Sequence, residues 1–364
     1  MNRTTKIITG IIVGSLVAFL IWEFSNIVFY ILMSVVLSLM GKPLVKKINS
    51  VKIGRFRLPN GISAFLTLLI IIFLFGVFFS IFVPLVARQA SVISNIDLNS
   101  LSQSIEEPLL EVEDFLHNYG ILGKEESVKH VLEIQFKSIL NLTSFSTVLG
   151  SMVGLTGTIF IAVFSILFLT FFFLKDAFIL DELVDNLTPI QYQNEVNHII
   201  KQSKRLLGRY FIGLIIEITA MITLLTIGLT FFGLENAVLI GFFGGMMNII
   251  PYLGPLIGAI IGIILAISTI LSTGYYSQIV SVTITVLAVF AFAKLIDDFI
   301  LQPLIYSNSV KAHPVEIFLV ILIAGTMAGI TGMILAIPTY TVLRIVAKEF
   351  LSQFSVVQKL TKNI

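Results

Sequence analysis

The chain has 364 residues, of which 57% are apolar and 12% are charged, and its mean hydropathy is +1.01. Soluble domains are about 45–50% apolar and about 25% charged, so this composition excludes a pair of soluble domains and indicates a protein surrounded by lipid. The 23 basic and 21 acidic residues nearly balance, which leaves no basic excess for nucleic acid, and the absence of cysteine excludes disulfides, iron–sulfur clusters and cysteine-based zinc sites.

Apolar runs that could cross a bilayer follow one another along the chain. A transmembrane helix needs about 20 mainly apolar residues. The first run begins with basic residues but has no small-residue cleavage site after it, so we expect a retained helix rather than a signal peptide. We predict an all-α, polytopic integral membrane protein with about seven or eight hydrophobic segments. The candidate segments are residues 7–22, 27–40, 62–86, 148–174, 206–234, 237–271, 279–296 and 315–346.

The basic residues predict an orientation, because positively charged loops stay in the cytoplasm. Residues 1–57 hold eight basic residues and residues 175–209 hold five. Residues 87–147 hold four basic residues against nine acidic ones. We therefore expect both termini, the basic loop 41–60 and the segment 175–205 in the cytoplasm, and the segment 87–147 outside.

These expectations divide the chain into four parts. Apolar residues recur three to five positions apart within residues 96–117 and 179–205, which is typical of amphipathic helices. Such helices lie on a membrane surface, between subunits or in solvent. The predicted parts are N-terminal transmembrane helices (1–86), an extracytoplasmic amphipathic segment (87–147), a transmembrane transport core (148–346) that includes the cytoplasmic amphipathic segment 175–205, and a cytoplasmic tail (347–364).

Two runs are too long for a simple crossing. Residues 237–271 and 315–346 would form straight helices of roughly 50 Å, whereas the hydrocarbon core is about 30 Å thick. Prolines at 251 and 255 interrupt the first run and clustered glycines at 325–332 interrupt the second. We predict two re-entrant helical hairpins whose tips face each other near the bilayer midplane. The alternative is two long, kinked spans with no site between them.

Ionisable residues within the spans are candidates for function. Glu217 lies near the middle of segment 206–234. It could exchange a proton or a cation, or it could be a structural carboxyl bonded to a neighbouring helix. Lys294 precedes Asp297 and Asp298 by three and four residues, which favours an ion pair within one helix. The alternative is that one aspartate faces a polar pathway.

We expect that pathway in the C-terminal half. A helix broken at membrane depth needs protein or water to satisfy its backbone, and broken helices form solute sites in secondary transporters; a kink without a ligand is the alternative. Glycines four apart also indicate close helix packing there. The candidate pathway residues are Glu217, Asn248, Pro251, Gly254, Pro255, Asp297, Asp298, Gln302, Pro303, Gly325, Gly329 and Gly332.

Motifs of an enzyme are absent from the sequence. There is no Walker phosphate loop, no GxSxG elbow and no His-Glu-x-x-His zinc motif. The four histidines are not spaced as metal ligands. We therefore expect neither catalysis, nor a cofactor, nor a metal site.

Several motifs of the C-terminal half resemble, in order and spacing, those of the autoinducer-2 exporter family. The similarity covers most of the chain and is strongest over residues 170–345. Leu214 departs from the pattern, because the family often has a polar residue there; the nearest polar residue here is Glu217. The motifs are Phe173-Leu-Lys-Asp176, Pro189, Gly208-Arg-Tyr-Phe-Ile-Gly213, Pro251-Tyr-Leu-Gly-Pro255, Asp298-Phe-Ile-Leu-Gln-Pro303, His313-Pro314 and Gly329-Ile-Thr-Gly332 followed by Pro338.

The resemblance implies a homo-oligomeric, multi-pass protein of the bacterial inner membrane. Family members are assigned to export of autoinducer-2 or to sodium/proton antiport. We expect a secondary transporter that moves a small polar solute, with autoinducer-2 as one candidate. The alternatives are a monovalent cation/proton antiporter that uses Glu217 and Asp297 or Asp298, and a membrane scaffold that transports nothing.

Overall fold

The structure is a computed structural model. It describes residues 23–50, 52–53, 56–94, 156–176, 179–273, 278–306 and 313–354, together with isolated positions 15, 19, 20, 357, 358 and 361. Most of the predicted helix 7–22 and most of the predicted outer segment 87–147 lie outside the described residues. The chain forms two compact units, which are treated separately: Met1–Phe75 with Leu155–Phe211 (unit 1), and Gly76–Gly154 with Ile212–Ile364 (unit 2).

Unit 1 is helical apart from one short β-ribbon. Gly41 brings α2 close to α8, since a Cβ at this position would lie 3.0 Å from Cδ2 of Leu174. Val45, Ala64 and Leu174 form the buried cluster beside this contact. The elements are α2 (Ser25–Ser50), β1 (Lys52–Ile53) paired antiparallel with β2 (Phe56–Arg57), the first part of α3 (Asn60–Ser94), α8 (Thr156–Lys175), α9 (Ile179–Leu187), the 3₁₀ turn Ile190–Tyr192 and the first part of α10 (Gln193–Phe231).

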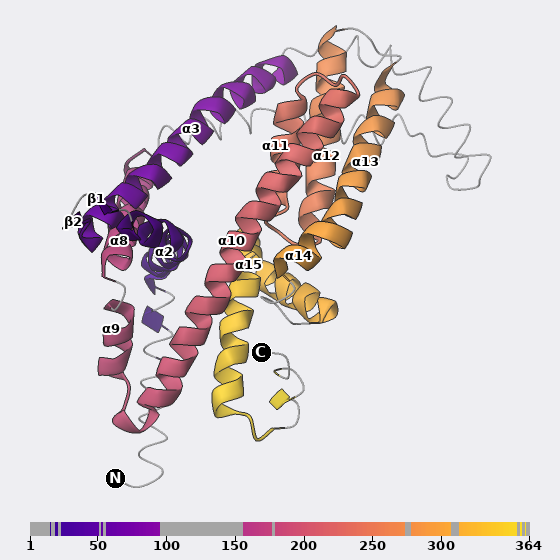
Figure 1. The fold of residues 1–364 in the computed structure, drawn as a ribbon. Helices are drawn as coiled ribbons and strands as arrows, with labels where there is room; N and C mark the ends of the chain where they lie inside the picture. Colours follow the sequence, from indigo (N-terminus) through magenta and orange to yellow (C-terminus); the bar gives the residue numbers. More distant parts are fainter. Residues whose placement is uncertain are drawn as a thin grey trace. The chain divides into compact units, whose positions relative to one another are not determined.

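Unit 2 contains the remainder of α3 and α10 and all later helices. In this unit α11, α12 and α13 pack side by side (Figure 1). Leu225 and Leu229 of α10, Ile240 of α11 and Val286 of α13 are fully buried in its core. The later elements are α11 (Ala237–Met247), α12 (Leu253–Thr273), α13 (Ile279–Ile296), the π-turn Asp297–Leu301, α14 (Gln302–Tyr306) and α15 (Pro314–Phe350).

The first long apolar run folds back on itself as an antiparallel helical hairpin, α11–α12. Asn236, just before α11, donates a 3.1 Å hydrogen bond from Nδ2 to Oγ1 of Thr269, near the end of α12. Further along, a Cβ at Gly258 would lie 2.9 Å from Cα of Gly244. In each pair, one residue precedes the break at 248–252 by about as many positions as the other follows it. The two helices therefore run side by side in opposite directions.

The second long run also reverses direction, within α15. Ala328 and Gly329 leave the helical conformation, and Gly329 has φ 59° and ψ −145°, a region that is essentially restricted to glycine. Tyr340 donates a 3.0 Å hydrogen bond from its hydroxyl to Oε2 of Glu316. In a straight helix these two residues would be about 36 Å apart, so their contact requires a hairpin. Re-entry of both hairpins into a membrane stays a prediction.

The all-α, multi-pass prediction is confirmed. Six helices of the described residues are long and apolar enough to cross a membrane. Phe73 of α3 is 68% exposed, as expected of a side chain that faces lipid. The predicted segment 279–296 coincides with α13. The predicted amphipathic segment 179–205 does not end at residue 205. It breaks at Pro189, and its second half continues without interruption into the apolar part of α10.

Candidate functional site

Glu217 and Asn248, two residues that the sequence singles out separately, meet inside unit 2. Glu217 projects from α10 and is 5% exposed, and Asn248 follows the last residue of α11 and is also 5% exposed. Nδ2 of Asn248 donates a 3.1 Å hydrogen bond to Oε1 of Glu217. A buried carboxyl therefore lies directly at the break between α11 and α12.

Close packing of α10 against α11 brings these two residues together. A Cβ at Gly241 would lie 2.7 Å from the backbone nitrogen of Thr226, and one at Gly245 would lie 2.6 Å from that of Ile222. The two glycines are one helical turn apart, so they form the kind of small-residue stripe that lets backbones touch. Glu217 on α10 and Asn248 at the end of α11 lie beyond this stripe.

The break itself is tightly turned and satisfies much of its own backbone. The amides of Asn248, Ile249 and Ile250 donate to carbonyls three residues earlier, and the Gly254 amide donates to the carbonyl of Ile250. These four amides are therefore satisfied within the break. Side chains are therefore the main polar groups that the break offers.

Glycine is required where the chain re-enters the helix after Pro251. A Cβ at Gly254 would collide with the carbonyl oxygen of Met247 across the break. Pro255 follows in the first turn of α12, where a missing amide hydrogen costs no helical bond. Pro251, Gly254 and Pro255, all predicted pathway residues, thus shape the turn that presents Asn248.

A second polar cluster surrounds the π-turn after α13. Nζ of Lys294 lies 2.8 Å from Oδ2 of Asp297 and 2.7 Å from Oδ1 of Asp298, which confirms the ion pair predicted from the spacing. Nε2 of Gln302 donates to the same two oxygens at 2.9 and 3.2 Å. The backbone amide of Gln302 donates to the Asp297 carbonyl five residues earlier. This wider turn places the side chains of Asp297 and Gln302 on the same side of the helix.

Asp297 is the unusual member of this cluster. It is 0% exposed, and its Oδ1 atom has no hydrogen-bond partner among the described residues. A buried oxygen of this kind costs about 1–3 kcal/mol unless something binds it. Together the cluster places two carboxylates against one ammonium group, so it carries an excess of negative charge. Pro303, the next predicted residue, is exposed at the start of α14.

Tyr252 connects the break to the second cluster, although nothing in the sequence marked it as a site residue. It adopts φ 66°, a left-handed conformation that is uncommon for any residue except glycine. Its hydroxyl lies within electrostatic range of Lys294 and Asp298. Its ring makes an edge-on contact with Phe318 of α15, with centroids 6.0 Å apart. The break thus has Glu217 near one end and the charged cluster near the other.

The second hairpin meets the first in a different way from the one predicted. Ile250, at the tip of the first hairpin, is buried against Ile321 and Ala336, which lie on the two legs of the second. At the reversal, a Cβ added to Gly329 would have no heavy atom within 4 Å, and Met327 beside it is 81% exposed. Contact is therefore between a tip and two legs, not between two tips.

The remaining predicted glycines belong to this second hairpin. A Cβ at Gly332 would collide with the carbonyl oxygen of Ala324 on the opposite leg, and one at Gly325 would lie 2.5 Å from Cε of Met333. Both glycines therefore allow the legs to approach, and Gly329 allows the chain to turn. These glycines therefore shape the second hairpin, and their positions do not indicate a direct contact with a solute.

A polar network that sequence reasoning missed lies at the open end of the first hairpin. Gln89 of α3, 3% exposed, donates a 2.6 Å hydrogen bond from Nε2 to Oγ of Ser268. Its Oε1 atom accepts a 3.2 Å hydrogen bond from Nδ2 of Asn236, which also bonds Thr269. A glutamine just after a long apolar run was the available signal, but nothing in the sequence pairs it with residues 147 to 179 positions away.

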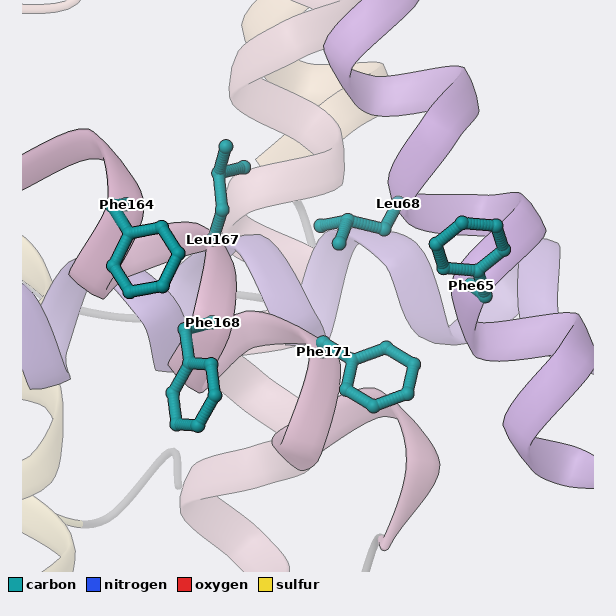
Figure 2. A pocket seen from close by; sticks show the side chains of 6 residues that line it. All are labelled: Phe65, Leu68, Phe164, Leu167, Phe168 and Phe171. Carbon is teal, nitrogen blue, oxygen red and sulfur yellow. The ribbon is translucent and has the colours of Figure 1, made fainter. Parts of the chain in front are cut away.

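Unit 1 contains a pocket of a different character. Figure 2 shows that it is lined by side chains of α3 and α8, and its volume is about 380 Å³. All lining side chains are hydrocarbon, so the pocket offers no side-chain hydrogen bond to a polar solute. The lining residues are Phe65, Leu68, Phe164, Leu167, Phe168 and Phe171.

Curated proteins that resemble the chain are transport proteins by name. It is 30% identical over 207 residues to "Putative transport protein YrrI" of Bacillus subtilis (strain 168), which is 56% of each chain. It is 28% identical over 204 residues to "Putative transport protein YueF" of the same organism, covering 56% of this chain and 52% of that one. The chain thus spans about half the length of these two relatives.

A third relative and a family profile extend the similarity. "Putative transport protein MJ1177" of Methanocaldococcus jannaschii is 24% identical over 330 residues, which cover 89% of this chain and 90% of that one. The profile described as AI-2E family transporter matches residues 10–352. Since this match runs across nearly the whole chain and the fold has the expected membrane-spanning helices, the chain belongs to the AI-2E family of transporters.

Proposed function

We propose that the protein is a secondary transporter that moves a small polar solute past the break between α11 and α12. Autoinducer-2 is one candidate for that solute. The observation that carries the proposal is the buried Glu217–Asn248 pair at a helix break, with Asn248 Nδ2 and Glu217 Oε1 3.1 Å apart. Polar side chains at a broken helix inside an apolar protein are the usual elements of a solute site.

The surrounding hairpins support a moving part. The tip of α11–α12 contacts α10 through Asn248 and α15 through Ile250. Displacement of this tip would break the Asn248–Glu217 hydrogen bond and the apolar and ring contacts that Ile250 and Tyr252 make with α15, while the helices behind it could stay packed. Alternating access by motion of such a hairpin requires few bonds to be exchanged in each cycle.

Flux through purified protein in proteoliposomes tests this proposal. We expect wild-type protein to transport one member of a panel that contains autoinducer-2 and other small polar solutes. Glu217→Gln and Asn248→Leu should each reduce that flux at least tenfold. Glu235→Gln, which neutralises an exposed acid before α11, should leave it unchanged. Equal flux in all three variants would remove the break from the pathway.

Exchange of a monovalent cation for protons is a second candidate, which one observation favours. Oδ1 of Asp297 is buried without a partner among the described residues, in a cluster that has two carboxylates and one ammonium group. Such a site can take up a proton or a monovalent cation to balance its charge. Asp297→Asn should then abolish sodium-driven proton movement in proteoliposomes, while Asp298→Asn, at the more exposed aspartate, should retain most of it.

We further propose that both termini lie in the cytoplasm of a bacterium and that residues 87–147 lie outside. Because the chain has no cysteine, single introduced cysteines report the topology without background. An impermeant thiol reagent added to whole cells should label Ser102→Cys and leave Ser50→Cys unlabelled. The opposite pattern would reverse the orientation.

A further inference from the structure

Four charged residues from three helices of unit 1 form a group that the proposed transport pathway does not use. We refer to Lys42 and Lys46 of α2, Asp181 of α9 and Lys204 of α10 as the basic corner. Nζ of Lys204 lies 2.5 Å from Oδ1 of Asp181. The charges of Lys46, Lys204 and Asp181 all act on Lys42. The ammonium groups of Lys42 and Lys204 therefore both interact with the Asp181 carboxylate, and Lys46 adds a third positive charge close to Lys42.

The two lysines that α2 contributes to the basic corner lie on one face of that helix. Gly41 and Val45 pack against α8 and α3. Lys42 and Lys46 each follow one of these residues, which places them about 100° further round the helix. They are one turn apart, so they lie on one face, away from the buried contacts.

The other side of the corner is held by the α9–α10 hairpin. Nδ2 of Asn197 donates a 2.9 Å hydrogen bond to Oδ1 of Asp185, near the turn at Pro189. Further from Pro189 along both helices, Asp181 bonds Lys204. These bonds fix α9 against α10 and hold Lys204 in position whether or not a ligand is present.

The corner has more positive charge than its own residues neutralise. Lys42 is half-buried, and Lys46 is exposed. Ammonium groups that lie close together repel one another, and partial burial weakens the screening by water. An anion between Lys42, Lys46 and Lys204 would relieve this repulsion. Lysine commonly binds phosphate groups as a point charge.

The same face of α2 is apolar further along the helix. Ile31 precedes Lys42 by 11 residues, so it lies within about 20° of the same direction and about 16 Å away along the axis. Ile31 is 38% exposed, and Ile27, one turn earlier, is 51% exposed. One strip of α2 therefore has a cationic end and an apolar stretch roughly as long as an acyl chain.

We propose that the basic corner binds the phosphate group of an anionic phospholipid, with the acyl chains lying along Ile31 and Ile27. Lys42 and Lys46 make the principal contacts, and Lys204 contributes while it remains paired with Asp181. This position is in the region that the distribution of basic residues predicts to be cytoplasmic, where basic pockets between helices bind anionic head groups. The proposal does not depend on the transported solute.

Lipid binding by the purified full-length protein tests the proposal. Native mass spectrometry in detergent would compare phosphatidylglycerol with phosphatidylcholine. Lys42→Gln and Lys46→Gln should each weaken phosphatidylglycerol binding about fivefold, as expected for one lysine near a lipid surface. Asp181→Asn should strengthen it, because the variant removes the one carboxylate. Lys47→Gln, an exposed lysine on another face of α2, is the matched control and should have no effect.

Three results would overturn the proposal. One is equal binding of phosphatidylcholine and phosphatidylglycerol by the wild-type protein. Another is an equal loss in Lys46→Gln and Lys47→Gln, which would indicate general charge attraction; because Lys46 is exposed, its variant should fold even if Lys42→Gln does not. The third is thermal stabilisation by inorganic phosphate that matches the effect of phosphatidylglycerol, which would identify free phosphate as the occupant.

Discussion

The two helical hairpins of unit 2 look alike in the sequence and differ in the structure. Each consists of a long apolar run broken near its centre. The tip of α11–α12 is turned by proline, and its Asn248 is buried against Glu217. The tip within α15 is turned by Gly329, whose positive φ is accessible mainly to glycine, and its neighbours Met327 and Ile330 are 81% and 68% exposed.

The difference shows that a break in a membrane helix is not by itself a site. A break presents a polar site only where the protein also supplies a buried partner for it. The first hairpin has such a partner on α10, whereas the second turns with a glycine and ends in exposed apolar side chains. The difference favours the first tip as the proposed solute site, with the second hairpin as the support that Ile250 contacts.

The largest effect should come from the glycines that bring the legs together, because both hairpins depend on them. In Gly254→Ala and Gly332→Ala the added Cβ meets a backbone carbonyl, which cannot move aside as a side chain would. We expect each to lower the free energy of unfolding by about 3 kcal/mol. Thermal unfolding of the purified protein would measure this. The control is Gly76→Ala in α3, where the new Cβ has no heavy atom within 4 Å; an equal loss there would refute the close approach.

The next effect should separate the two tips. Glu217→Leu leaves the buried amide of Asn248 without this acceptor, which should cost about 2 kcal/mol. Glu217→Gln keeps an acceptor oxygen and should cost much less. At the second tip, Thr326→Val removes only an exposed hydroxyl that bonds its own helix, so its effect should stay within about 0.5 kcal/mol. Similar losses at both tips would contradict the difference between them.

Much of this architecture was predictable from local sequence signals. Apolar length, proline and clustered glycine located both breaks, and the three- and four-residue spacing located the Lys294 ion pairs. These signals act within one helix, so a single sequence contains them. The bond between Asn248 and Glu217 joins residues 31 positions apart, and the sequence marked both residues without pairing them. The partner of Gln89 and the left-handed Tyr252 depend on tertiary packing, which no local pattern specifies.

A third prediction concerns the open end of the first hairpin. Gln89→Leu removes the contacts of one side chain with Ser268, Asn236 and the Leu265 carbonyl. Asn236 keeps Thr269 as a partner, so we expect a loss of about 1.5 kcal/mol. Arg88→Gln, at the exposed neighbouring position on α3, should be nearly neutral. If Gln89→Leu were also neutral, the network could not be what holds α3 to this hairpin.

The smallest effect should come from the open end of the second hairpin, where a hydrogen bond joins the two legs near their ends. Tyr340→Phe removes the hydroxyl that donates to Oε2 of Glu316 at 3.0 Å. The ring remains, and so does the Arg344 guanidinium 5.6 Å from its centroid, so the variant isolates the hydrogen bond. Because the pair is only partly buried, we expect a loss of about 1 kcal/mol. A double-mutant cycle with Glu316→Leu should return a coupling of that size. If instead Tyr340→Phe lowered the free energy of unfolding more than Gln89→Leu did, the open end of the second hairpin would be more strongly bonded than that of the first. The proposal that the second hairpin supports a moving first hairpin would then be wrong.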